Sequence, residues 1–180
     1  MDQNFTRSVL SWYDAGHRDL PWRRTKDAYR IWVSEIMLQQ TRAETVVSYY
    51  ERFLARYPDV RALADAPEEE LLKAWEGLGY YSRARLLQKA ARAIVSQYGG
   101  ELPADLKKLR ALPGVGDYTS GAIASIAFGI PAAAVDGNVE RVICRYFAIS
   151  EEMGSPKSRR MIHELAQSLV PPDRPGAFAN

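Results

Sequence analysis

One glutamate lies within a strongly apolar stretch of the sequence, where an ionised side chain is costly. Glu35 falls in the segment AYRIWVSEIML, and at helical spacing it shares a face with Ala28, Ile31 and Gln39. Burial on such a face raises the pKa of a carboxyl group because it disfavours the anion. A carboxylic acid that stays protonated near neutral pH can serve as a general acid. The alternative is a structural ion pair between Glu35 and an arginine such as Arg42.

A second candidate acid, Asp136, follows a glycine turn, a helix of small residues and an extended linker within residues 112–138. The turn, PGVG at residues 113–116, leaves backbone N–H groups uncovered by any Cβ atom, so an anion can approach them. The helix that begins near Asp117 adds its positive N-terminal end. This combination suits a nucleic-acid phosphate. The alternatives are an ordinary turn between helices and an Asp136 that only caps the helix expected over Asn138–Phe147.

Length and charge limit the classes of protein. A chain of 180 residues suits one domain or two small ones, and its net charge of +2 is weaker than a purely electrostatic DNA binder would carry. The basic residues are nevertheless clustered, although each cluster alone is also compatible with a solvated face. The clusters are Arg18, Arg23 and Arg24; Arg83 and Arg85; Lys107, Lys108 and Arg110; and Lys157, Arg159 and Arg160.

The single cysteine indicates a reducing compartment, because no disulfide can form within the chain. Cys144 is expected on a buried helix face with a packing role. The sequence has no signal peptide and no apolar run long enough to span a membrane. We therefore expect a cytoplasmic protein, associated with the nucleoid if it is bacterial, with no membrane partner.

Helical patterns separated by glycine and proline predict an all-α fold with short connections. Period-two strand patterns are essentially missing. The expected helices are Phe5–Ala15, Asp27–Leu38, Arg42–Tyr57, Pro67–Glu76, Tyr80–Tyr98, Asp105–Ala111, Asp117–Phe128, Asn138–Phe147 and Lys157–Leu169.

Several segments resemble those of one enzyme family. The hairpin LPGVGDYTS joined to VDGNV is similar to the helix-hairpin-helix and Gly/Pro…Asp superfamily of base-excision DNA glycosylases. SEIMLQQTRAETV at 34–46, LPWR at 20–23 and GLGYYSRAR at 77–85 resemble the signatures of adenine DNA glycosylases, the MutY family. The similarity extends over about residues 8–170.

The resemblance implies two helical lobes with a cleft that holds an extruded base. Residues 25–133 match the six-helix barrel lobe, with the helix-hairpin-helix at about 105–128. Residues 1–24 and 134–180 match the second lobe, which is incomplete because the iron–sulfur loop is missing.

The resemblance also implies the chemistry. Cleavage of an N-glycosidic bond needs two carboxyl groups in opposite protonation states, as in glycoside hydrolysis. Protonated Glu35 matches the acid that protonates adenine N7, and ionised Asp136 matches the group that stabilises or traps the sugar cation. Asn138 matches a position that supports the sugar or the attacking water. Tyr118 stands where bifunctional relatives such as endonuclease III carry a Schiff-base lysine.

Binding residues are carried over in the same way. The positions that match the adenine pocket are Arg18, Trp22, Arg23 and Leu38. The positions that match DNA contacts are Gln39, Gln40, Thr41, Tyr80, Arg83, Gly114, Val115 and Gly116. Tyr80 matches the intercalating aromatic, although it could also be an ordinary aromatic residue at a helix start.

We therefore predict a monofunctional DNA glycosylase that excises adenine opposite 8-oxoguanine or guanine, acting as a monomer on duplex DNA. The alternatives are a thymine-mismatch glycosylase, which can also carry tyrosine at position 118, and a non-catalytic helix-hairpin-helix DNA-binding module. Full-length relatives are expected to hold a [4Fe-4S] cluster and a lesion-reading C-terminal domain, and this sequence contains neither. No cofactor is expected within the chain, apart from a monovalent cation at the hairpin.

Overall fold

The computed structural model describes residues 3–151 and 154–180, and within these ranges it contains helices and no strand. This confirms the predicted all-α class. The α-helices are α1 (Gln3–Gly16), α2 (Ala28–Leu38), α3 (Ala43–Arg56), α4 (Val60–Asp65), α5 (Glu68–Ala74), α6 (Tyr81–Tyr98), α7 (Leu106–Arg110), α8 (Asp117–Phe128), α9 (Gly137–Tyr146), α10 (Pro156–Leu169) and α11 (Pro175–Ala179), and a 3-10 turn, η1, covers Pro21–Arg23.

All nine expected helices are present, with ends displaced by no more than about one turn. The displacement at α2 and α7 has a simple cause: Asp27 and Asp105 stand before the helix and cap it. Their carboxylates accept hydrogen bonds from Arg30 N and Lys108 N at 2.8 and 2.9 Å. Helix α4 was not predicted because it is only six residues long, although Asp59 caps it in the same way.

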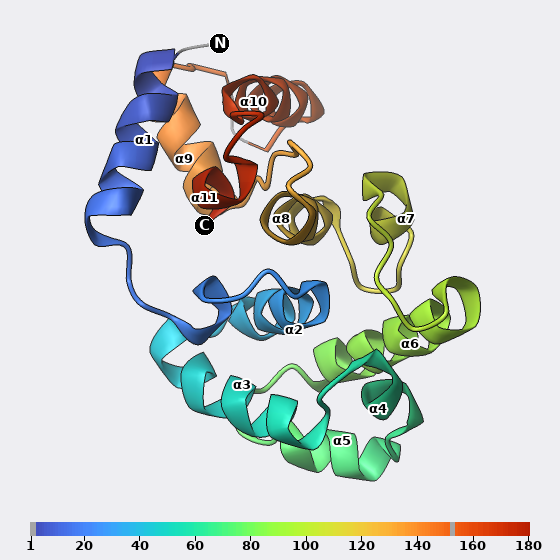
Figure 1. Cartoon of the computed structure of the whole chain (residues 1–180). Coiled ribbons are helices and arrows are strands. Elements are labelled where there is room, and N and C mark those ends of the chain that lie inside the picture. The colour runs from blue at the N-terminus through green and yellow to red at the C-terminus, as the bar shows by residue number, and fades with distance from the viewer. Residues whose placement is uncertain (1–2, 152–153) are drawn as a thin grey trace.

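The larger hydrophobic core lies among helices α2 to α8 (Figure 1). Helix α2 is buried at its centre, with Trp32 and Val33 fully buried, and packs against α3, α6 and α8. Edge-on aromatic packing of Phe53 against Trp75, with ring centroids 5.8 Å apart, ties α3 to the end of α5. The central position of α2 explains why its sequence is apolar on nearly every side.

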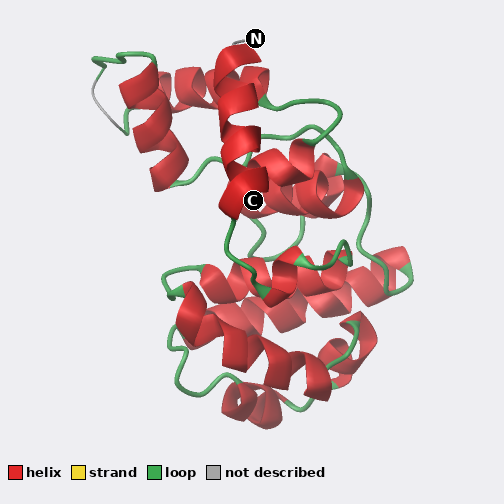
Figure 2. Ribbon diagram, turned by 60° about the vertical axis from the view of Figure 1, so that its left-hand side comes forward, coloured by secondary structure: helices red, strands yellow, loops and turns green. Residues whose placement is uncertain are grey.

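A smaller hydrophobic core is formed by residues that follow Ala132, and it includes Ile143 and Ile162. Helices α9 and α10 pack together, and α1 and α11 lie beside them, so that the first and last helices of the chain are in contact (Figures 1 and 2). Helix α8 contacts α2 on one side and α11 on the other. The two cores adjoin at Ala132 and Ala133.

The predicted lobe limits, 25–133 and 1–24 with 134–180, stay a prediction. The residues of the two cores fall close to these limits, with one difference. Leu20 and Trp22 belong with the larger core, although they precede residue 25.

Candidate active site

Glu35 is buried in the last two turns of α2, and only 7% of its surface is exposed. Burial raises the pKa of its carboxyl group to about 7, and the nearby charge of Asp136 acts in the same direction. One carboxyl oxygen, Oε2, has no hydrogen-bond partner among the described residues. None of the ion pairs found there includes Glu35, so the alternative pairing with Arg42 is not observed.

Tyr118 reaches Glu35 from the first turn of α8. Its hydroxyl group hydrogen-bonds to the Glu35 carboxyl and lowers the pKa of Glu35, which partly offsets the effect of burial. Burial and the neighbouring carboxylates raise the pKa of Tyr118 above its ordinary value. The tyrosine therefore stays protonated and acts on Glu35 as a neutral donor.

Asp136 precedes α9 and caps it. Oδ1 of Asp136 accepts hydrogen bonds from the backbone N–H groups of Asn138 and Val139 at 3.0 and 2.8 Å. Oδ2 accepts a third from the Asn138 side chain at 3.0 Å. Three donors on one half-buried carboxylate fix its direction. Capping thus orients the same carboxylate whose charge acts on Glu35.

The linker that carries Asp136 is held by α8 and α10. The Ser125 hydroxyl donates to Ala132 O at 2.6 Å, and Gln167 bonds both Pro131 O at 3.0 Å and Ala133 N at 2.9 Å. A Cβ at Gly121 would lie only 2.2 Å from Ala133 O, so only glycine allows the linker to approach α8 this closely. Neither Ser125 nor Gln167 was predicted as a site residue, although a serine inside an apolar helix was an available signal.

The hairpin joins α7 to α8 and uses its two glycines differently. Gly114 has φ +74°, in the left-handed region, and a Cβ there would lie 2.8 Å from Leu86 Cβ. Gly116 has extended backbone angles, and a Cβ there would meet nothing within 4 Å. Val115 is buried beneath the turn. Gly114 is thus required by the fold, whereas Gly116 leaves open space at the N-terminus of α8.

The residues expected to enter DNA are placed on two adjoining turns. Gln40 and Tyr80 are exposed, and both adopt left-handed backbone angles, with φ values of 59° and 49°. Gln39 is half-buried, and its side chain donates to Thr119 Oγ1 at 3.5 Å. Arg83, expected to contact DNA, is instead 91% buried and binds backbone carbonyls of both turns. The geometry therefore favours a role inside the protein for Arg83.

Of the residues matched to the adenine pocket, Trp22 and Arg23 lie on η1, Leu38 ends α2, and Arg18 lies in the segment between α1 and η1. Trp22 is buried and packs edge-on against Tyr50, with ring centroids 5.5 Å apart. Arg18 is exposed and pairs with Glu44 at 2.7 Å. Leu38 is half-buried against the larger core. Arg23 lies close enough for its charge to lower the pKa of Glu35.

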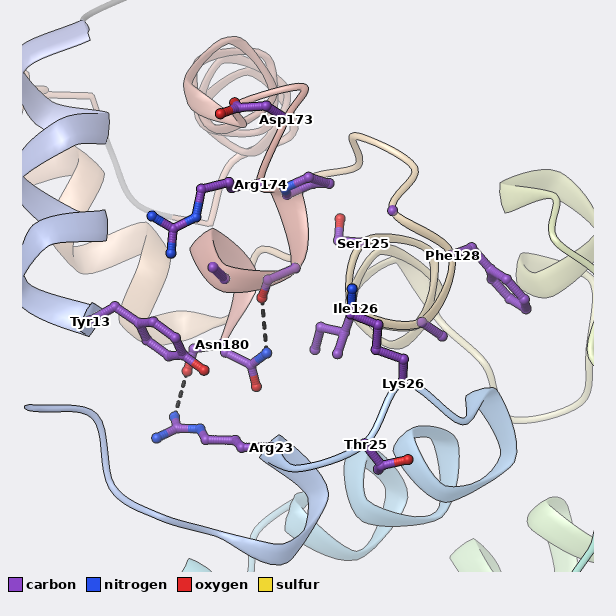
Figure 3. A pocket seen from close by; sticks show the side chains of 15 residues that line it. Tyr13, Arg23, Thr25, Lys26, Ser125, Ile126, Phe128, Asp173, Arg174 and Asn180 are labelled. Carbon is purple, nitrogen blue, oxygen red and sulfur yellow. Dashed lines mark hydrogen bonds between the residues drawn. The ribbon is translucent and has the colours of Figure 1, made fainter.

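Arg23 also borders a pocket of about 440 Å³ between η1, the C-terminal end of α8 and α11 (Figure 3). Its guanidinium donates to O of Asn180, which also lines this pocket, at 2.5 Å. Glu35 and Tyr118 do not line it, because Tyr118 lies at the opposite end of α8. The pocket is therefore distinct from the cluster of acids.

The described residues contain no group of three or more histidine, cysteine or acidic side chains that could hold a metal ion. Cys144 is half-buried against the smaller core rather than fully buried. One cysteine does not fit a [4Fe-4S] cluster, which needs four thiolates. In the same part of the chain, no helix is both long and apolar enough to cross a membrane.

Comparison with known proteins identifies the relatives of this arrangement. The family described as HhH-GPD superfamily base excision DNA repair protein matches residues 33–172. Human adenine DNA glycosylase is 50% identical over 97% of this chain and 34% of its own length. The adenine DNA glycosylase of Buchnera aphidicola subsp. Baizongia pistaciae is 38% identical over 93% of this chain and 47% of its own length. The chain thus spans between a third and a half of these relatives.

Solved structures confirm the fold. A thermostable thymine-DNA glycosylase superposes with a TM-score of 0.91 and 36% identity, covering 98% of this chain and 82% of its own. A trapped endonuclease III–DNA covalent intermediate superposes with a TM-score of 0.79 at 24% identity, covering 97% of this chain and 79% of its own.

Proposed function

Because the chain belongs to the HhH-GPD superfamily of base excision DNA repair proteins, we propose that it is a monofunctional DNA glycosylase that removes adenine mispaired with 8-oxoguanine or guanine. The observation that carries this proposal is the cluster of Glu35, Tyr118 and Asp136, in which the pKa of one acid is raised to about 7 beside a hydrogen-bonded carboxylate. The partner is duplex DNA bound by a monomer, and the cytoplasmic location stays a prediction.

The two acids divide the reaction between them. The bond between C1′ and the base breaks, its electron pair leaves with adenine, and the proton of Glu35 adds to N7, so that the base departs neutral. The Asp136 carboxylate stabilises the positively charged sugar until water adds to C1′, and the proton that this water loses returns Glu35 to its acid form. Asn138, which binds Asp136 and accepts a hydrogen bond from Arg141 at 3.1 Å, holds this carboxylate in place. The product is an intact strand with an abasic site.

A thymine-mismatch glycosylase is the second candidate, favoured by the 36% identity and TM-score of 0.91 to the thymine-DNA glycosylase. A panel of labelled duplexes separates the two, with adenine opposite 8-oxoguanine, adenine opposite guanine, and thymine opposite guanine. Alkali is added after incubation to cut abasic sites. We expect cleavage of the adenine strands. Release of thymine alone would establish the second candidate, and release of neither base would leave a DNA-binding module.

The hairpin offers a test of phosphate anchoring. Gly116→Val should fold normally because a Cβ at Gly116 meets nothing within 4 Å, but the added methyl groups would obstruct an approaching phosphate. We expect matched and mismatched duplexes to bind more weakly by about the same factor, because phosphate contacts carry no sequence information. Affinity should be measured at several salt concentrations.

Gly16→Val is the matched control, since Gly16 is equally open and ends α1, far from the hairpin in Figure 1. It should leave affinity unchanged. If Gly116→Val instead loses only mismatch discrimination, the hairpin reads bases and does not anchor a phosphate.

Tyr118→Lys should create strand-cleaving activity that the natural sequence lacks. A lysine at this position places an amine in the site beside Glu35, where it can form a Schiff base with the opened sugar. A duplex with a preformed abasic site makes the assay independent of base release. We expect borohydride to trap a protein–DNA adduct at roughly tenfold or more above the background of the unmodified chain.

Asp117→Lys places the same amine one residue away on an exposed position and should give no adduct. An adduct formed by the unmodified chain would contradict the monofunctional assignment.

A further inference from the structure

Arg83 joins two segments that are distant in the sequence. Its guanidinium donates to carbonyls at the end of α2 and to carbonyls of the turn before α6. The contacts from Nη1 are to Ile36 O at 2.9 Å, Met37 O at 3.1 Å and Gln39 O; those from Nη2 are to Leu78 O at 3.1 Å, Gly79 O at 3.3 Å and Thr41 Oγ1 at 3.3 Å. One side chain therefore fixes the spacing between residues 36–41 and 78–79.

The surroundings of Arg83 account for its burial without a carboxylate partner among the described residues. The last carbonyls of α2 lack partners within the helix and carry its negative end, so a guanidinium satisfies them. The rings of Trp75 and Tyr80 lie with their centroids 5.6 and 5.5 Å from the guanidinium carbon, within cation–π range. The charge of Arg83 is thus engaged by the protein rather than offered to a phosphate.

Each of the two joined segments contains one exposed residue with left-handed backbone angles. Gln40 and Tyr80 have φ values of 59° and 49°, a conformation that is unfavourable for residues other than glycine. Tyr80 is 62% exposed. Such backbone conformations persist where surrounding contacts stabilise them. Here the shared contact is Arg83, which donates hydrogen bonds to the neighbouring residues Gln39 and Gly79.

We propose that Arg83 is a positioning residue that locks the 39–41 segment and the 78–80 turn together, so that Gln40 and Tyr80 meet duplex DNA as one preformed element that extrudes the target base. This inference rests on the proposed function. Base extrusion costs a few kcal/mol of unstacking and unpairing. Side chains that are already ordered lose less entropy when they insert into the duplex. A displacement of Gln40 relative to Tyr80 would weaken the insertion of both.

The test measures extrusion separately from chemistry. Every protein carries Glu35→Gln, and the duplex contains 2-aminopurine, whose fluorescence rises on unstacking, opposite 8-oxoguanine. Arg83→Lys keeps the positive charge, but a single ammonium cannot span both segments. We expect about tenfold or greater loss of the fluorescence increase at saturating protein. Affinity for a fully matched duplex should stay within about twofold, because the charge is retained.

A phosphate-contacting Arg83 predicts the opposite, since lysine also binds phosphate: an unchanged fluorescence increase would overturn the proposal. A purely structural role would lower the melting temperature but leave the signal of the folded, bound variant intact, which would also overturn it. Gly79→Ala provides a second variant that retains Arg83 and adds a Cβ in open space, while disfavouring the φ of +70°. It should show the same selective loss, and a full signal from it would contradict the locked turn.

Because the signal needs no base release, the outcome is independent of the glycosylase assay. If the Glu35→Gln protein with Arg83 intact extrudes 2-aminopurine but the natural sequence releases no adenine, the proposed function is refuted and the role of Arg83 stands.

Discussion

Replacing Asp136 with asparagine should reduce adenine release by about a thousandfold while the protein stays folded and still binds duplex DNA. Asparagine keeps a carbonyl oxygen that can accept from the backbone N–H groups of Asn138 and Val139, so the cap on α9 survives. What it removes is the negative charge that stabilises the sugar cation. Single-turnover release and duplex affinity should be measured on the same preparation.

Asp59→Asn is the control, because Asp59 also caps a helix, α4, by accepting from Ala62 N at 2.9 Å, and it lies outside the cluster of acids. It should leave release unchanged. Near-normal release by Asp136→Asn would reduce Asp136 to a capping residue, and loss of folding would assign its main effect to stability.

Glu35→Gln should abolish adenine release and also stabilise the protein at alkaline pH. An amide of the same shape cannot deliver a proton to N7. The pKa of Glu35 is about 7 in the folded protein against an ordinary value of 4.5, so the folded state binds the proton more tightly than the unfolded chain. Stability contributed by this group is therefore greatest below about pH 4.5 and declines as the pH rises towards about 7.

The glutamine variant lacks this decline. From the difference between pKa values of 4.5 and about 7, the free energy of unfolding of this variant should exceed that of the natural protein by on the order of 3 kcal/mol at alkaline pH. Urea unfolding of both proteins at acidic and alkaline pH measures the difference. Glu68→Gln, an exposed acid paired with Arg85, should show little change at either pH. A stability difference that does not grow with pH would mean that Glu35 ionises normally, and undiminished adenine release would make it structural.

Local patterns in the sequence were sufficient for most of the helices. Helical patterns separated by glycine and proline predict α2 and α7, and the hairpin predicts the start of α8 at Asp117. The short α4 lies below the length at which periodicity is informative. The same limit applies to η1, since three residues contain no repeat.

The site was predictable only where the signal is local. Glu35 is conspicuous because an acid in an apolar helix is costly, and its burial follows directly from that pattern. The burial of Arg83 was not predictable, because a basic residue in a polar motif gives no sign that carbonyls from α2 and the 78–79 turn converge on its guanidinium. The contacts of Gln167 with Pro131 and Ala133 span more than thirty residues of sequence. Such contacts depend on how the helices pack, which no local pattern encodes.

The pH dependence of single-turnover adenine release from a duplex with adenine opposite 8-oxoguanine tests the central claim most directly. A Glu35 proton donor with a pKa of about 7 predicts a rate that falls as the pH rises through that value, with the strand left intact until alkali is added. A rate that stays level through neutral pH, or that Glu35→Gln does not diminish, would contradict the assignment of Glu35 as the acid that releases the base.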